Sequence, residues 1–333
     1  MGDGTKENPF TREDVLRLIE ENGGTAEGLD LSRKVFKVAI DLSSLDLRGI
    51  ILEKAMFPVH FAGEKTSGAR FNASRLWNAH LEKADLQHAH FEAAELTGAH
   101  LEEAILASSH LEGADLIGAH LEGADLSITH LEGADFGDAH LKGAFLWGAK
   151  FSSYTKLEGV DWGDYILGDE KDEKKVGERE EYLILWSVDN PYRRLKLWYT
   201  EYGIYNVAGE FFFREMTIRR KVLKWWPHPL PRAWSKFISL ICGYGERPLR
   251  VIGWAASVVL GLAFIYFIVG SVWEWWAFWK SLYFSAASFT ALGYGSWLEI
   301  TNDWIKGIGA FESFIGVFTM ALFLITFVRK MTR

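Results

Sequence analysis

One stretch of the sequence is suited to binding a dehydrated monovalent cation. From Thr290 to Gly295 the chain reads Thr-Ala-Leu-Gly-Tyr-Gly. Backbone carbonyl oxygens can replace the water shell of a cation when they all point into one narrow passage. The two glycines, Gly293 and Gly295, permit the φ/ψ combinations that such an arrangement requires and that side chains forbid. The chemistry indicated is therefore coordination of an ion by main-chain oxygens, with no covalent bond made or broken.

The sequence around this stretch places it within a membrane. Two apolar runs, residues 251–270 and 308–328, lie on either side of it. Each run is long enough to cross the roughly 30 Å hydrocarbon core as a helix, whereas the intervening residues 277–289 are too few to do so. Non-helical backbone at membrane depth is tolerated only where it is buried in protein or lines water. Residues 251–333 are thus predicted to form an all-α two-span pore domain with a re-entrant loop.

This order of spanning helix, short helix, glycine-rich loop and spanning helix resembles the pore module of the potassium-channel family. The family pattern Thr-Thr-Val-Gly-Tyr-Gly-Asp aligns with residues 290–296. Three positions differ, namely Ala291, Leu292 and Ser296, which leaves the choice between potassium and sodium open. The resemblance implies a selectivity filter to which four identical chains each contribute one loop. The ion-binding residues it implies are Thr290, Ala291, Leu292, Gly293, Tyr294 and Gly295.

Several residues near the loop are candidates for supporting it. Glu312 is the only acidic or basic residue inside either apolar run, which makes it a functional candidate. We expect it to form hydrogen bonds behind the filter and to replace the acid missing at Ser296. Glu299 and Asp303 are expected at the outer mouth, where acidic groups either concentrate cations or anchor helix ends. Gly316 is either a gating hinge or a point of close packing against the short helix.

A five-residue period governs the region before the membrane segments. From Phe71 to Phe151 a Leu, Phe or similar residue occupies every fifth position, and a small residue lies two positions before each. This period fits neither a helix nor a strand. A fixed repeat of this kind predicts a solenoid whose units share one core. The pattern resembles the pentapeptide-repeat family, which implies a right-handed quadrilateral β-helix with four repeats per coil over residues 42–166.

Histidines recur every ten residues along this predicted solenoid. With four repeats per coil, residues twenty apart stack, so the histidines fall into two columns on opposite faces. The columns are either a solvated product of tandem duplication or a pH sensor, since imidazole changes charge near neutral pH. Metal binding is disfavoured because we recognise no convergent third ligand in the columns. The histidines are His80, His90, His100, His110, His120, His130 and His140.

The remaining segments complete a mixed fold. Residues 1–41 are predicted to form an N-terminal helical cap, with Thr11 as the N-cap residue. Residues 167–231 are predicted to contain a charged linker and a cytosolic helical hairpin joined around Gly203. Residues 232–250 alternate basic and apolar positions with helical spacing, which predicts an interfacial (slide) helix. A second Gly-Tyr-Gly closes that segment and is expected to be a turn.

Composition limits the partners and the location. The net charge of −8 argues against a basic surface for nucleic acid. The single cysteine, Cys242, excludes an intramolecular disulfide and suits a reducing compartment. Basic residues flank both apolar runs on one side, at Arg250 and Arg329, so both termini are expected in the cytoplasm. The amino terminus lacks the features of a signal peptide, and we expect a multi-pass protein of the cell (inner) membrane.

These observations favour a homotetrameric cation channel, with potassium preferred, in which the solenoid regulates or assembles the pore. Two alternatives stay open: a weakly selective cation channel, and a membrane-anchored repeat protein of the DNA-mimic or scaffold type. An enzyme is not expected, because no nucleophile is paired with an oriented base. No cofactor or metal is expected beyond permeant K⁺. The expected partners are further copies of the chain, the lipid bilayer and an unknown cytosolic ligand or protein on the solenoid, but no nucleic acid.

Overall fold

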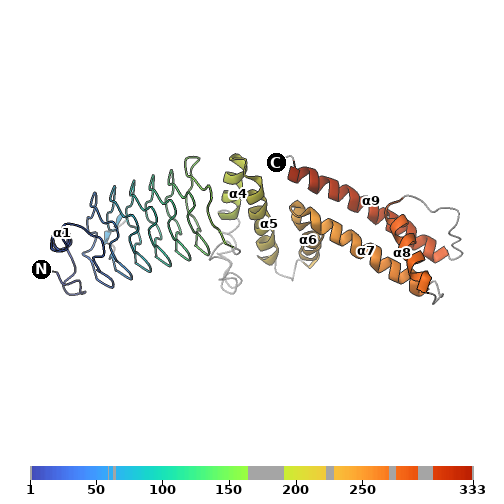
Figure 1. Ribbon diagram of the computed structural model, residues 1–333, viewed down its shortest axis with the longest axis horizontal. Helices are drawn as coiled ribbons and strands as arrows, with labels where there is room; N and C mark the ends of the chain where they lie inside the picture. Colours follow the sequence, from blue (N-terminus) through green and yellow to red (C-terminus); the bar gives the residue numbers. More distant parts are fainter. Residues whose placement is uncertain are drawn as a thin grey trace. The chain divides into compact units, whose positions relative to one another are not determined.

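The computed structural model forms two compact units, Met1–Arg194 and Leu195–Arg333 (Figure 1). Much of the predicted charged linker, and the loop from residue 292 to residue 302, lie outside the described part of the chain. The structure describes residues 2–58, 60–62, 65–163, 191–222, 229–269, 275–291 and 303–331.

A short helix, α1 (Arg12–Glu21), stands at the start of the first unit. Thr11 is its N-cap, as predicted, and forms a reciprocal capping box with Asp14. The Asp14 carboxylate also accepts a hydrogen bond from the Gly2 amide at 3.0 Å. Phe10, just before the helix, packs with its ring centroid 5.8 Å from that of Phe36. The helix therefore covers the apolar end of the first coil.

Stacked coils make up most of the described part of the first unit (Figure 1). Parallel β-bridges join residues twenty apart, for example His80 with His100 and Asp115 with Asp135. Twenty residues are four five-residue repeats, so the predicted coil size is confirmed. The regularly spaced Leu, Phe and Ala side chains point inward and are almost fully buried, with Leu121 and Ala124 both 0% exposed. Backbone hydrogen bonds connect each coil to the next, and the apolar columns form one continuous core.

Both ends of the solenoid depart from the regular spacing. Asp30 already bridges Ile51, so the coils begin inside the region predicted as a helical cap. The next coil is longer, because the hairpin of β1 (His60–Ala62) and β2 (Lys65–Ser67) leaves it. At the other end Asp135 bridges Lys156, one residue beyond the regular spacing. The sequence contains the same shift, because Leu157 follows Phe151 after six residues and not five.

Two helices, α4 (Pro191–Glu201) and α5 (Tyr205–Val222), form the predicted hairpin. Gly203 in the connection has a φ of +73°, a backbone conformation that glycine adopts without strain. The Lys196 ammonium lies 3.1 Å from the Glu215 carboxylate, which is buried. The ring centroids of Tyr199 and Phe211 are 5.5 Å apart. An ion pair and an aromatic contact thus hold the two helices together.

The predicted interfacial helix is α6 (Pro229–Cys242), and a short 3-10 turn, η2 (Gly243–Gly245), follows it. The second Gly-Tyr-Gly is therefore a turn, as expected. Tyr244 has a φ of +57°, and its hydroxyl lies 2.8 Å from that of Ser235. Beyond the turn, the Arg247 guanidinium lies over the ring of Phe213 in α5 at 4.3 Å and contacts the Glu210 carboxylate at 3.2 Å. We call this group of contacts the α5–α7 junction.

Three helices complete the second unit: α7 (Pro248–Val269), α8 (Trp275–Phe289) and α9 (Asp303–Met331). The whole of α7 and residues Gly307–Val328 of α9 are long and apolar enough to cross a membrane. The 15 residues of α8 rise by only about 22 Å, which is short of the hydrocarbon thickness. Because α8 packs against both longer helices, the predicted order of spanning, short and spanning helices is present.

We expect Asp14 to stabilise the first unit in a pH-dependent way. A hydrogen bond from the Thr11 amide, helped by the Thr11 hydroxyl and the Gly2 amide, lowers the pKa of Asp14 from 3.8 to about 2. The stabilisation is therefore complete above about pH 4 and is lost as the pH falls through 2. Asp14→Asn should lower the free energy of unfolding by about 1 kcal/mol at pH 7.

The measurement is denaturant unfolding of the full chain at pH 7 and at pH 2, followed by circular dichroism. Glu20→Gln, an exposed position on the same helix, is the control and should change nothing at either pH. An equal loss of stability for Asp14→Asn at both pH values would contradict the expectation.

Candidate functional site

The end of α8 leads into the predicted filter. The Thr290 hydroxyl donates a hydrogen bond to the Ala286 carbonyl at 2.8 Å. Ala291 has a φ of +52°, in the left-handed region that non-glycine residues seldom occupy. The chain therefore turns out of the helical path at the first two filter residues. The other predicted site residues of the loop lie outside the described residues: Leu292, Gly293, Tyr294, Gly295, Ser296 and Glu299.

Glu312 joins all three helices of this part of the chain. Its side chain, on α9, is 0% exposed. The Tyr266 hydroxyl of α7 donates to one carboxylate oxygen at 2.7 Å, and the Ser285 hydroxyl of α8 donates to the other. The Ser285 hydroxyl oxygen also lies 2.8 Å from the Val259 carbonyl oxygen. Glu312 thus accepts hydrogen bonds from α7 and α8, and its expected role behind the filter, in place of the acid missing at Ser296, stays a prediction.

A second set of contacts fixes the end of α8 against α9. The Ser313 hydroxyl donates to the Ser288 carbonyl at 2.7 Å. One turn further along α9, a Cβ atom added at Gly316 would lie 1.7 Å from the Phe289 carbonyl oxygen. Only glycine permits this approach. Close packing, one of the two roles considered for Gly316, is therefore observed, and the gating hinge stays a prediction.

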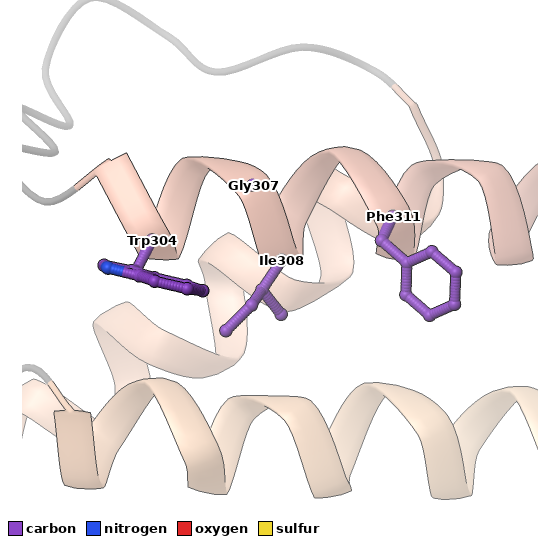
Figure 2. A pocket seen from close by; sticks show the side chains of 4 residues that line it. All are labelled: Trp304, Gly307, Ile308 and Phe311. Carbon is purple, nitrogen blue, oxygen red and sulfur yellow. The ribbon is translucent and has the colours of Figure 1, made fainter.

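An apolar hollow of about 430 Å³ lies along the first turns of α9. Trp304, Gly307, Ile308 and Phe311 line it, and this spacing puts them on one helix face. Figure 2 shows the side chains of Trp304, Ile308 and Phe311 extending from the same side of α9. Trp304 is 81% exposed and Phe311 is 65% exposed. Asp303 begins this helix, and its side chain lies outside the described part of the structure. The outer part of α9 thus presents an open apolar face.

The histidine columns of the solenoid are present as predicted. On one face the rings of His80, His100 and His120 stack with centroids 4.8 Å apart and planes within 2°. His140 continues this column. On another face His110 stacks on a neighbour at each side, at 4.8 and 4.6 Å. The members of this second column are His90, His110 and His130.

The expectation that the columns have no third ligand is wrong. A glutamate two residues after each of six histidines turns toward the imidazole. The Nδ1 atom of His80 lies 2.9 Å from the Glu82 carboxylate, and that of His100 lies 3.1 Å from the Glu102 carboxylate. The signal was the triplet His-Leu-Glu or His-Phe-Glu repeated every ten residues. The glutamates are Glu82, Glu92, Glu102, Glu112, Glu122 and Glu132.

Two family models match separate parts of the chain. The model for pentapeptide repeats matches in eight copies, over residues 67–102, 94–133 and 129–153. The model described as an ion channel matches residues 254–333, which contain the last 16 of the 22 residues of α7 and the whole of α8 and α9. One match falls on the region with the five-residue period, and the other falls on the region with the two apolar runs.

Solved structures similar to this chain are pentapeptide-repeat proteins. QnrB1, a plasmid-mediated fluoroquinolone resistance protein, is 24% identical with a TM-score of 0.30, and the match covers 40% of this chain and 65% of QnrB1. HetL from the cyanobacterium Nostoc is 24% identical with a TM-score of 0.25, over 46% of this chain and 70% of HetL. The chain thus spans just under two thirds of the first relative. No curated protein matches the sequence.

Replacing Gly316 should disturb the filter by moving α8. In Gly316→Ala the new methyl group would overlap the Phe289 carbonyl, so the end of α8 must shift by more than 1 Å. Overpacking of this kind typically costs about 1–3 kcal/mol. We expect near-complete loss of ion flux from reconstituted vesicles. Gly253→Ala, on α7 with open space at the Cβ position, should conduct normally, and equal flux from both variants would contradict the expectation.

Replacing Glu312 should weaken the packing of α7, α8 and α9 against one another. In Glu312→Val the hydrogen bonds from the Tyr266 and Ser285 hydroxyls to the carboxylate are lost, at a cost of about 1–3 kcal/mol for each, and Ser285 keeps the Val259 carbonyl as its acceptor. We expect lower thermal stability of the detergent-solubilised protein together with loss of conduction. Glu312→Gln keeps one carbonyl oxygen as an acceptor, so its stability and conduction should lie between those of the wild type and of Glu312→Val. Unchanged stability and flux in Glu312→Val would show that this residue does not support the filter.

Proposed function

We propose that this chain, which contains pentapeptide repeats and an ion-channel domain, is one subunit of a homotetrameric cation channel that prefers potassium. One observation carries the proposal. The ion-channel match covers two helices able to span a membrane and a short helix between them, and the Gly-Tyr-Gly sequence follows the short helix after three intervening residues. An anchored scaffold has no need of that arrangement.

The proposed conduction site is built from main-chain oxygens. Thr290, Ala291, Leu292, Gly293, Tyr294 and Gly295 of each chain would supply carbonyl or hydroxyl oxygens in place of the ion's hydration shell. The carboxyl end of a helix carries a partial negative charge, and the end of α8 immediately precedes this stretch. That end favours a cation over an anion. Main-chain ligands also explain why the changes at Ala291 and Leu292 are compatible with conduction.

Four copies are proposed because one loop cannot enclose an ion. The described residues of α9 leave a wide apolar face exposed, which includes Phe311, Phe314 and Phe318. Within a membrane protein such a face meets lipid or another subunit. We assign the hollow beside Gly307 to a neighbouring copy, because glycine allows close approach of a second helix. Glu299, Asp303 and Ser296 would then surround the outer mouth and raise the local cation concentration.

We propose that the protein is a multi-pass protein of the inner membrane, with both termini in the cytoplasm. Arg247 and Arg250 precede the first span, while Arg329 and Lys330 follow the second. Positive charge on one side of both spans favours that side as cytoplasmic. The solenoid, whose right-handed sense remains part of this proposal, would then lie in the cytosol. There it would assemble the tetramer or regulate the pore by binding a ligand or protein.

Reconstitution into a planar bilayer with unequal potassium and sodium on the two sides tests the proposed function. We expect single-channel currents that reverse near the potassium equilibrium potential. Gly293→Ala should abolish them, because a methyl group restricts the backbone conformations that turn the carbonyl oxygens inward. Gly261→Ala, on α7 with open space at its Cβ position, should leave them intact.

A reversal potential near zero would indicate the weakly selective alternative. Absence of any current from folded, inserted protein would favour the anchored scaffold.

A further inference from the structure

The histidine columns also contain a column of carboxylates. On the first face, Glu82, Glu102 and Glu122 each occupy one coil, and the stacked rings beside them are 4.8 Å apart. Carboxylates at roughly that spacing repel one another unless positive charge lies between them. Each histidine accounts for one carboxylate oxygen only. The arrangement therefore calls for a cation between successive coils.

The second carboxylate oxygen supports the same conclusion. The Oε2 atoms of most of these glutamates are buried and have no hydrogen-bond partner among the described residues. A buried acceptor normally has a partner. The same orphaned atom recurs on both faces of the solenoid, so it follows from the repeat and not from one misplaced side chain. The residues are Glu82, Glu102, Glu112, Glu122 and Glu132.

The donor atoms gather in groups of three. On the first face one group contains His80, Glu82 and His100, and a separate group contains Glu102, His120 and Glu122. Within each group the ligand atoms lie within 4.8 Å of one another.

The second face offers two groups of the same kind that overlap. They are His90, Glu92 and His110, and His110, Glu112 and His130. Because both need His110, only one can hold an ion at a time. We propose that the columns bind divalent transition-metal ions of the zinc type, two on the first face and one on the second.

The side chains can reach the required geometry. Zinc bonds of about 2.0–2.2 Å to nitrogen and oxygen place tetrahedral ligands about 3.4 Å apart, so the donor atoms must move closer by about an ångström. A metal ion lies in the plane of the imidazole that binds it, and the stacked rings are nearly parallel. In the three groups that contain two histidines, one ring must therefore rotate. The histidine side chains are between 27% and 42% exposed, which leaves room for that rotation.

The donor set also suits the proposed ions. Imidazole and carboxylate are common zinc ligands, and three of them leave one coordination position for water. An ion held between two coils would clamp them together, so binding should raise the unfolding temperature of the solenoid. The proposed metal binding involves only residues of the solenoid and does not depend on the proposed channel function.

The test is equilibrium dialysis of the full-length protein, purified without a histidine tag, against micromolar Zn²⁺, with the bound metal measured by mass spectrometry. We expect three ions per chain and a higher unfolding temperature. His110→Gln removes a ligand from both overlapping groups and should reduce the count to two.

The matched controls are His90→Gln and His130→Gln. Each leaves the other overlapping group complete, so both should keep three ions. His120→Gln, on the first face, should also reduce the count to two, and the double variant with His110→Gln should bind one. Co²⁺ in place of Zn²⁺ should give the visible absorption of a tetrahedral site.

Two outcomes would overturn the proposal. Wild-type protein that binds no Zn²⁺ would show that the histidine columns are not metal sites. A His90→Gln variant that loses as much metal as His110→Gln would show that the ions do not occupy the groups described. Circular dichroism of each variant establishes that the solenoid is folded.

Discussion

The packing of α7, α8 and α9 depends on the hydrogen bonds to the buried carboxyl group of Glu312. Its two oxygens accept hydrogen bonds from Tyr266 on α7 and Ser285 on α8, while its backbone belongs to α9. In a hydrocarbon environment water cannot replace these bonds, so a helix that moved away would leave a polar group unpaired. The contacts of Ser313 and Gly316 then fix the end of α8. The position from which the chain enters the filter stretch is thus set by three residues within two turns of α9.

In the solenoid the constraint is a different one. Because a coil takes up twenty residues, each side chain lies directly above its counterpart in the next coil, and like groups stack on like groups. For Leu and Ala this stacking buries a continuous apolar column. For glutamate it brings equal charges together, which costs stability unless counter-charge is present. The repeat that builds a continuous apolar core therefore also stacks like charges on the surface of the solenoid.

Much of the architecture could be predicted because it follows from period and length. Leu and Ala at fixed spacing predict the coils, and the apolar runs around residue 280 predict two long helices and one short helix. The partners of Glu312 could not be predicted, since Tyr266 lies 46 residues away and only packing brings it near. Leu31 and Phe36 keep the five-residue spacing, but Leu42 follows one residue late, and this break in the period hid the first coil. The glutamates beside the histidines escaped notice because their approach depends on side-chain torsions that spacing does not specify.

The α5–α7 junction has a mechanical consequence. Arg247, at the base of the first spanning helix, is held by stacking on Phe213 and by its charge contact with Glu210. The turn at Tyr244 leaves almost no slack between α6 and α7. A movement of α5 is therefore transmitted through Arg247 to the first residues of α7.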